Sequence, residues 1–247
     1  MKDKFGRLFA GEYPGRMIIL GRDPSGKYNI VVYAITGRSP SSQARKIIQK
    51  NQGFWVKPTD SDILSQGNEE LLIYPSILFR NGIAVSNGRQ TDDIARSMEL
   101  CNDALHSLIF SLQSWDYEPD SPSFTPRISG CIYKGEKAAL SILKRGNDGT
   151  TLRYFFGIPL IKGHVKMIAT YTGENVDPLP SFQGEPLDVE MALQTPEETA
   201  EEFYYALKPG EKDFRVAVAS IFSHVQDWKK QFSYIINRHE RNDKEHG

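Results

Sequence analysis

The stretch RMIILGRDPSGKYNIVVYAIT, residues 16–36, contains two runs of aliphatic and aromatic residues separated by a short polar segment. Arg16–Asp23 and Tyr28–Thr36 are each typical of a strand, and Pro24-Ser25-Gly26-Lys27 between them is typical of a tight turn. We therefore predict an antiparallel hairpin. The spacing from Gly21 to Gly26-Lys27 imitates a phosphate-binding G-x-x-x-x-G-K loop. That loop needs a hydroxyl residue next and must open a helix, whereas here Tyr28 and a strand follow.

Other strand-like runs follow along the chain, and several begin or end near glycine, proline or asparagine. Pro75 interrupts the run Glu69–Phe79, so we expect an edge strand or a bulge at that point. The residues from Gly37 to Gly67 are mostly polar, and we expect little regular structure in them. The remaining predicted strands are Ile83–Val85, Ile128–Tyr133, Ala138–Lys144, Leu152–Ile158, Val165–Tyr171, and Phe214–Phe222 with Phe232–Ile236 as its hairpin partner.

Two helices are predicted. The first runs from Asp92 to Ser114 with Thr91 as its N-cap, because apolar residues recur along it at helical spacing. The second begins with Thr195-Pro196-Glu197-Glu198, which combines an N-cap threonine, a proline at the first helical position and a glutamate for a capping box, and it ends near Leu207. The predicted buried face of the first helix comprises Ile94, Met98, Cys101, Leu105, Leu108, Ile109 and Leu112.

Two helices among many antiparallel-type strands predict an α+β fold in which layered sheets are flanked by helices. We see no internal repeat and no linker that would divide the chain, so residues 1–237 are predicted to form a single domain. Residues 238–247 are almost entirely charged or polar, and we predict a disordered tail there.

The composition limits the classes of function. The 247 residues include 30 basic and 31 acidic side chains, for a net charge of −1, so general binding to nucleic acid is not expected. No apolar run has the length of a membrane span, and no secretory signal follows the first charged residues, so we expect a soluble cytoplasmic protein. The cysteines and histidines show no metal-ligand spacing, and we predict no metal site.

Three loops contain arginines beside small or polar residues, a composition suited to anion binding. The first is Gly37–Arg45, with Arg38, Ser39 and Arg45. The second is the Asn87-Gly88-Arg89 turn before the first helix. The third joins Asp116–Asp120 to Arg127, where carboxylates near an arginine could transfer protons. Each loop has a plainer interpretation as a solvated loop, a capped helix or a surface ion pair.

The order of these motifs resembles the archaeal-type IMP cyclohydrolase family and its bacterial relatives. The resemblance covers roughly residues 13–175, and its motifs are Tyr13–Arg16, Gly37–Arg45, Ser86–Asp92, Asp116–Glu118 and Thr125–Ile128. It implies a four-layer αββα fold like that of the N-terminal-nucleophile hydrolases. It also implies closure of the formamido-imidazole-carboxamide ribonucleotide (FAICAR) to inosine monophosphate (IMP) with loss of water. Both reacting groups are then on one molecule, so no cofactor is expected. The partner would then be a small purine ribonucleotide, and assembly into a homo-oligomer stays open.

Motif matching under this resemblance assigns roles to eight residues. Arg38, Ser39 and Arg45 would contact the phosphate or another part of the substrate, and Asn87 and Arg89 would form a second wall. The reacting end would comprise Tyr74, Glu118 and Arg127, with Glu118 as the proton shuttle and Arg127 as the partner of the oxyanion or carboxamide.

Two alternative functions stay open. Ala44 and Pro75 stand where the family pattern leads us to expect polar residues, so a purine-nucleotide-binding relative without catalysis is one alternative. The fold analogy suggests an N-terminal-nucleophile amidohydrolase as the other. Such an enzyme needs Ser, Thr or Cys as its first mature residue, and the first such residue here is Ser25, so internal cleavage would be required.

Overall fold

A computed structural model describes residues 11–60, 73–134, 136–207 and 212–241. Within these ranges the strands form two antiparallel sheets. The six-stranded sheet has the order β11-β10-β1-β2-β12-β13, made of β11 (Leu187–Glu190), β10 (His164–Ala169), β1 (Arg16–Arg22), β2 (Tyr28–Thr36), β12 (Arg215–His224) and β13 (Gln231–Asn237). The seven-stranded sheet runs from β3 to β9 in sequence order: β3 (Arg45–Lys50), β4 (Gly53–Pro58), β5 (Tyr74–Phe79), β6 (Gly82–Ser86), β7 (Arg127–Tyr133), β8 (Lys137–Arg145) and β9 (Thr151–Ile158). The predicted mixture of α and β structure with antiparallel sheets is confirmed.

The predicted hairpin at the start of the chain is confirmed by the pairing of β1 with β2, in which Gly21 lies opposite Ile30. Asp23 holds the turn, since its carboxylate accepts hydrogen bonds from the backbone N–H of Tyr28 at 2.7 Å and of Ser25 at 3.0 Å. The glycine-rich segment is therefore a turn between strands and not a phosphate loop.

The two sheets face each other across a common core. The Tyr33 hydroxyl on β2 lies 3.0 Å from the Tyr74 hydroxyl on β5, and a Cβ at Gly130 on β7 would meet Leu20 of β1. Because side chains alternate along a strand, Arg16, Ile18 and Leu20 share the face of β1 that points toward the other sheet. The arginine at the start of β1 therefore lies between the sheets.

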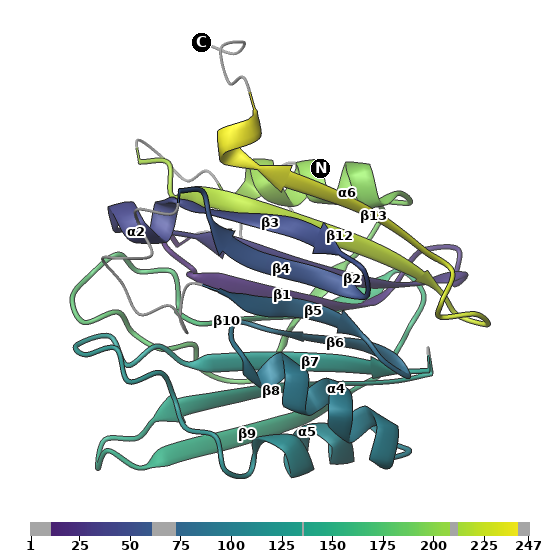
Figure 1. Ribbon diagram of the computed structural model, residues 1–247, viewed down its shortest axis with the longest axis horizontal. Helices are drawn as coiled ribbons and strands as arrows, with labels where there is room; N and C mark the ends of the chain where they lie inside the picture. The colour runs from purple at the N-terminus through teal and green to yellow at the C-terminus, as the bar shows by residue number, and fades with distance from the viewer. Residues whose placement is uncertain (1–10, 61–72, 135, 208–211, 242–247) are drawn as a thin grey trace.

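The longer helices pack on different sheets. In Figure 1, α4 (Gln90–Leu100) and α5 (Ala104–Leu112) lie over the seven-stranded sheet, and α6 (Pro196–Ala206) lies near β13. The contacts agree, because α4 and α5 touch β5–β9, whereas α6 touches β12, β13 and β2. Two short elements lie near the start of β3 and after β13: α2 (Pro40–Gln43) and the 3-10 helix η2 (Arg238–Glu240).

The prediction of one helix from Asp92 to Ser114 is wrong. The helix ends at Leu100, Cys101 is extended, and Asp103 starts a new helix by accepting hydrogen bonds from the N–H groups of Leu105 (2.9 Å) and His106 (3.1 Å). The apolar spacing continues across the break, which explains the error. Ile109, predicted to be buried, is 41% exposed as a result.

The predicted N-cap at Thr91 is also wrong. Arg89 is the N-cap of α4 and makes no side-chain capping bond, and Thr91 lies inside the first turn. The Thr91 hydroxyl donates to the Gly88 carbonyl oxygen at 2.9 Å.

Replacing Asp103 with alanine is expected to destabilise the protein by about 1 kcal/mol, because two N–H groups at the start of α5 lose their acceptor. Chemical denaturation of both proteins measures this difference. Asp103→Ser keeps a capping oxygen and is expected to recover most of the stability. An unchanged free energy of unfolding in Asp103→Ala would contradict the assigned cap.

The second predicted helix is confirmed. Thr195 is the N-cap of α6, its hydroxyl oxygen accepts a hydrogen bond from the Glu198 N–H at 3.1 Å, and Pro196 is the first helical residue. The Glu198 carboxylate completes the cap differently from a capping box, because it accepts from the Gln194 N–H at 3.3 Å.

The strand predictions were incomplete. β3 and β4 lie in the segment expected to have little regular structure, and β11 was not predicted. The bulge expected at Pro75 is confirmed, because Trp55 pairs with Pro75 whereas Phe54 pairs with Ile77. Residues 69–72 of the predicted strand lie outside the described residues.

The beginning of the tail predicted to be disordered contains η2, and the Arg241 guanidinium lies 2.7 Å from the Glu201 carboxylate on α6. Disorder stays a prediction for residues 242–247, which lie outside the described residues. Among the described residues, no helix is long and apolar enough to cross a membrane.

Candidate functional site

A polar cavity of about 230 Å³ opens where loops from both sheets meet. Arg16 at the start of β1 and Arg45 at the start of β3 reach it from opposite sheets. Its other described lining residues come mostly from loops: Tyr13, Arg38, Ser39, Ser42, Glu118, Asp120, Ser123, Thr125, Tyr171 and Leu179. All three predicted arginine-bearing segments lie nearby, but only the first and third contribute to this lining.

The guanidinium groups of Arg16 and Arg45 are buried without a full set of partners. The two side chains belong to residues only 9% and 6% exposed. The Arg16 Nε, and the Arg45 Nε and Nη1, have no hydrogen-bond partner among the described residues. Buried N–H donors without acceptors are costly, and a buried unpaired cation is more so. This end of the cavity is therefore prepared to receive an anionic or strongly polar group.

The electrostatics of the two arginines differ. Burial lowers the pKa of Arg45, and the nearby charge of Arg16 lowers it further. Burial also acts to lower the pKa of Arg16, but the neighbouring Tyr74, Tyr13, Tyr33 and Glu118 outweigh that effect and raise it above its ordinary value. The surroundings therefore disfavour the protonated form of Arg45, whereas they favour that of Arg16.

Glu118 is a buried carboxyl in the same cavity. Burial raises its pKa to about 6, with Asp120 adding to the rise, while Arg16 and Arg127 act in the opposite direction. A carboxyl that titrates near neutral pH can accept a proton in one step and return it in the next. Glu118 is therefore suited to the proton transfer expected of it.

Asn87 fixes the loops behind Glu118 and is not among the described lining residues. Its amide nitrogen donates to the Pro126 carbonyl oxygen at 2.9 Å and to Glu118 Oε1 at 3.3 Å. Its amide oxygen accepts from the Ile128 N–H at 2.9 Å and from Gln90 Nε2 at 3.1 Å. The Asn87-Gly88 turn thereby connects β6 to the start of β7 and supports the carboxyl.

Arg127 also lies behind Glu118 and outside the described lining. Its Nη1 is 3.8 Å from Glu118 Oε1, and its Nε donates to the Asp116 carbonyl oxygen at 2.8 Å. The guanidinium also packs on the Trp115 ring at 4.8 Å from the centroid. These contacts hold Arg127 against the Glu118 side chain.

Arg38 and Ser39 lie at the rim of the cavity. Arg38 packs over the Tyr13 ring and pairs with Asp177, whose carboxylate is 2.9 Å away and 77% exposed. The Ser39 hydroxyl oxygen caps α2 by accepting from the Ser42 N–H at 3.1 Å. An exposed ion pair of this kind is weak, so an incoming anion can replace Asp177.

The structure separates the other two predicted residues from the lining. Arg89 is exposed and is not among the described residues that line the cavity. Tyr74 is buried outside this lining, and its hydroxyl lies 3.0 Å from that of Tyr33.

Sequence reasoning gave no role to Arg16 or Tyr171, and it named Asp120 only as one of the carboxylates of the third loop. The signal for Arg16 was available, since it shares the period-two face of Ile18 and Leu20 in an apolar strand, where a solvated arginine would be unusual. Tyr171 offered no such signal, and nothing in the sequence linked it to Asp120. They meet only in three dimensions, where the Thr125 hydroxyl bonds to Asp120 and lies 2.7 Å from the Tyr171 hydroxyl.

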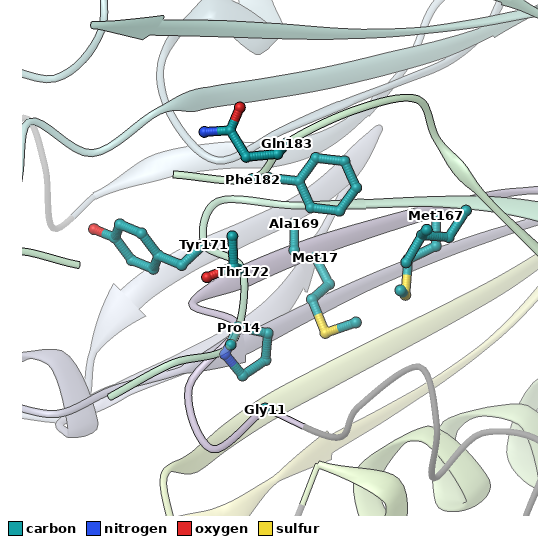
Figure 2. A pocket seen from close by; sticks show the side chains of 11 residues that line it. Gly11, Pro14, Met17, Met167, Ala169, Tyr171, Thr172, Phe182 and Gln183 are labelled. Atoms are coloured by element: carbon teal, nitrogen blue, oxygen red, sulfur yellow. The ribbon is translucent and has the colours of Figure 1, made fainter. Parts of the chain in front are cut away.

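A second cavity, of about 190 Å³, is lined mainly by apolar side chains. Figure 2 shows Met17, Met167 and Phe182 around it, with the Tyr171 ring at one side. Its lining does not suit a charged nucleotide. Among the described residues, no group of three or more His, Cys, Asp or Glu side chains could hold a metal ion.

Comparison with known proteins identifies the family. The family described as IMP cyclohydrolase-like protein matches residues 13–227, a range that includes every described lining residue of the polar cavity. The chain belongs to this family. The resemblance drawn from the motifs is therefore confirmed.

Curated members of this family are similar over most or half of the chain. The IMP cyclohydrolase of Methanothrix thermoacetophila is 33% identical over 174 residues, which cover 70% of this chain and 80% of that relative. The IMP cyclohydrolase of Methanococcus maripaludis strain C6 is 29% identical over 123 residues, 49% of this chain and 59% of that relative. That of Methanosphaera stadtmanae is 33% identical over 132 residues, 50% of this chain and 60% of that relative.

Proposed function

We propose that this protein is an IMP cyclohydrolase, which closes FAICAR to IMP with loss of water, and that the polar cavity is its active site. The family membership and the curated relatives support the activity. The observation that supports the location is the pair of buried arginines whose N–H groups lack partners, in a cavity that also holds a buried carboxyl.

The exposure of the lining residues suggests how the ribonucleotide lies. The phosphate binds at the rim, where Arg38 exchanges Asp177 for the phosphate and the Ser39 and Ser42 hydroxyls donate to it. The imidazole with its carboxamide and formamide groups extends inward. Arg16 and Arg45 then meet the oxygens on which negative charge develops.

The reaction requires one bond to form and one to break. The carboxamide nitrogen attacks the formyl carbon, and the π electrons of the formyl C=O move to its oxygen, which Arg16 and Arg45 stabilise. The Glu118 carboxylate takes one proton from the attacking nitrogen and passes it to that oxygen, which gives the carbinolamine hydroxyl. It then takes the proton of the formamide N–H and passes it to the hydroxyl as the C–O bond breaks, so that the ring C=N bond forms and water leaves with both protons. Both reacting groups belong to one molecule, so holding them in the reactive orientation provides much of the rate.

The remaining roles are supporting ones. Asn87 and Arg127 hold Glu118 in place, and Tyr74 is a buried partner of Tyr33 in the core between the sheets. We place Arg89 outside the site. We also propose that the sheets and helices form the four-layer αββα arrangement of N-terminal-nucleophile hydrolases in a single domain, since helices pack on both sheets and the sheets share a core. The cytoplasmic location and a homo-oligomeric state stay predictions.

The test is turnover of FAICAR by the purified chain, followed as the appearance of IMP by ultraviolet absorbance. We expect a rate well above spontaneous cyclisation. Arg38→Ala is expected to raise KM about tenfold through loss of a charged phosphate contact. Arg80→Ala, at a half-buried arginine near Glu99 and outside the described lining, is the matched control and should behave like the natural chain.

Two other outcomes would favour the alternatives. Tight binding of IMP without turnover would indicate a nucleotide-binding relative. Amide hydrolysis by a chain cleaved to expose Ser, Thr or Cys, identified by mass spectrometry, would indicate an amidohydrolase.

A further inference from the structure

β3, which begins with Arg45, is an outer strand of the seven-stranded sheet and pairs with β4 on one side. On its other side, the side chain of Asn237 forms hydrogen bonds with both the N–H and the C=O group of Ile47. The Ile47 N–H donates to Asn237 Oδ1 at 2.8 Å, and Asn237 Nδ2 donates to the Ile47 carbonyl oxygen at 2.9 Å. The asparagine amide therefore occupies the place that a neighbouring strand would fill.

Asn237 is the last residue of β13 in the other sheet and is only 5% exposed. Its Nδ2 also lies 3.0 Å from Glu240 Oε2, which orients the amide. Two residues later, the His239 Nε2 is 2.9 Å from the carbonyl oxygen of Gln43, in the short helix between Ser39 and Arg45. Residues 237–239 thus contact β3 and the short helix α2, which adjoin two of the three arginines that line the cavity, Arg45 and Arg38. They lie beyond residue 227, where the family match ends.

The position of the Arg45 side chain depends mainly on where its backbone lies. Two of its guanidinium nitrogens have no hydrogen-bond partner among the described residues, so few polar contacts hold the side chain. Arg45 and Ile47 are buried and share one face of β3, because they are two residues apart in a strand. Anchoring the Ile47 peptide groups therefore fixes where the Arg45 side chain enters the cavity.

We propose that Asn237 is a positioning residue for Arg45, so that the end of β13 tunes the affinity of the cavity for its anionic ligand. This inference rests on the proposed function, because IMP serves as the ligand. Loss of the amide lets the start of β3 move away from the cavity. The chemical step at Glu118 is little affected.

The experiment is a double-mutant cycle with the full chain, in which calorimetry measures the Kd of IMP. Asn237→Ala is expected to weaken binding about tenfold. In an Arg45→Met background the same substitution is expected to change Kd less than about twofold, because the group that Asn237 positions is already gone. Additive effects in the two backgrounds would overturn the proposal. Ser233→Ala, an exposed residue of β13, is the matched control and should leave Kd unchanged.

A second measurement needs no nucleotide and separates this inference from the proposed function. Phenylglyoxal modifies accessible arginines, and peptide mass spectrometry gives its rate at Arg45. We expect Asn237→Ala to raise that rate several-fold; an unchanged rate would overturn the proposal even if IMP binds elsewhere. If Asn237→Ala does not fold, Asn237→Asp takes its place, since it keeps the acceptor for the Ile47 N–H and loses the donor to the Ile47 carbonyl oxygen.

Discussion

Replacing Arg45 with methionine is expected to raise the stability of the unliganded protein while it lowers FAICAR turnover by a factor of roughly 10²–10³. The stability gain should be about 1–3 kcal/mol, as found when a buried charge is replaced by an apolar side chain of similar length. The reason is that burial and the charge of Arg16 both disfavour the protonated guanidinium, and two of its nitrogens lack acceptors. The substrate oxygens supply those acceptors.

Thermal unfolding in the absence and presence of IMP measures this trade of stability for function. IMP should raise the Tm of the natural chain. Without IMP, Arg45→Met should have a higher Tm than the natural chain, and IMP should raise it little further. Arg22→Met provides a control at a half-buried arginine that does not line the cavity. A destabilised Arg45→Met with normal turnover would mean that Arg45 is held by contacts within the protein and does not serve the substrate.

Glu118→Gln is expected to lower turnover by roughly 10²–10⁴, the range typical of a lost proton-transfer group. In the natural chain, kcat/KM should rise with pH through about 6, because the ionised carboxylate is the form that accepts the proton and burial raises its pKa to about 6. The residual activity of Glu118→Gln should lack this rise. A variant with a near-normal rate, or with the same pH profile, would remove Glu118 from the chemistry.

The same pKa predicts an effect on stability with a definite sign. The pKa of Glu118 is about 6 in the folded chain and 4.5 as its ordinary value, so the folded state binds the proton more tightly. This contribution of ~2 kcal/mol is fully present below pH 4.5 and is lost as the pH rises through about 6. Glu118→Gln should therefore be more stable than the natural chain at pH 8 and closer to it at pH 4.5. Denaturation at the two pH values measures the difference.

The parts of the fold that sequence predicted well are those with strong local signals. The β1–β2 hairpin follows from its two continuous apolar runs and the turn between them, and α6 follows from Thr195 and Pro196 at its start. The division between α4 and α5 was missed because the apolar spacing continues through Cys101, although Asp103 is itself a strong capping residue. β3 and β4 were missed because their apolar runs are short, Ile47-Ile48 and Phe54-Trp55-Val56, and lie within a mostly polar segment.

The candidate site was predictable only in part, because its residues come together through tertiary structure. Motif order pointed to Arg38, Arg45 and Glu118, and all three line the same cavity. It could not show that Arg127 pairs with Glu118 from outside the lining, that Tyr74 is buried against Tyr33, or that Arg89 is not among the described lining residues. Those placements depend on the pairing of two sheets whose strands are far apart in sequence.

The central claim is that the buried arginines of the polar cavity are ligands for the nucleotide. A crystal structure of the full chain with IMP tests it most directly. We predict the nucleotide in the cavity, with its phosphate near Arg38 and with nitrogens of Arg16 and Arg45 within hydrogen-bond distance of its oxygens. IMP bound elsewhere, with those nitrogens still unpaired, would contradict the claim.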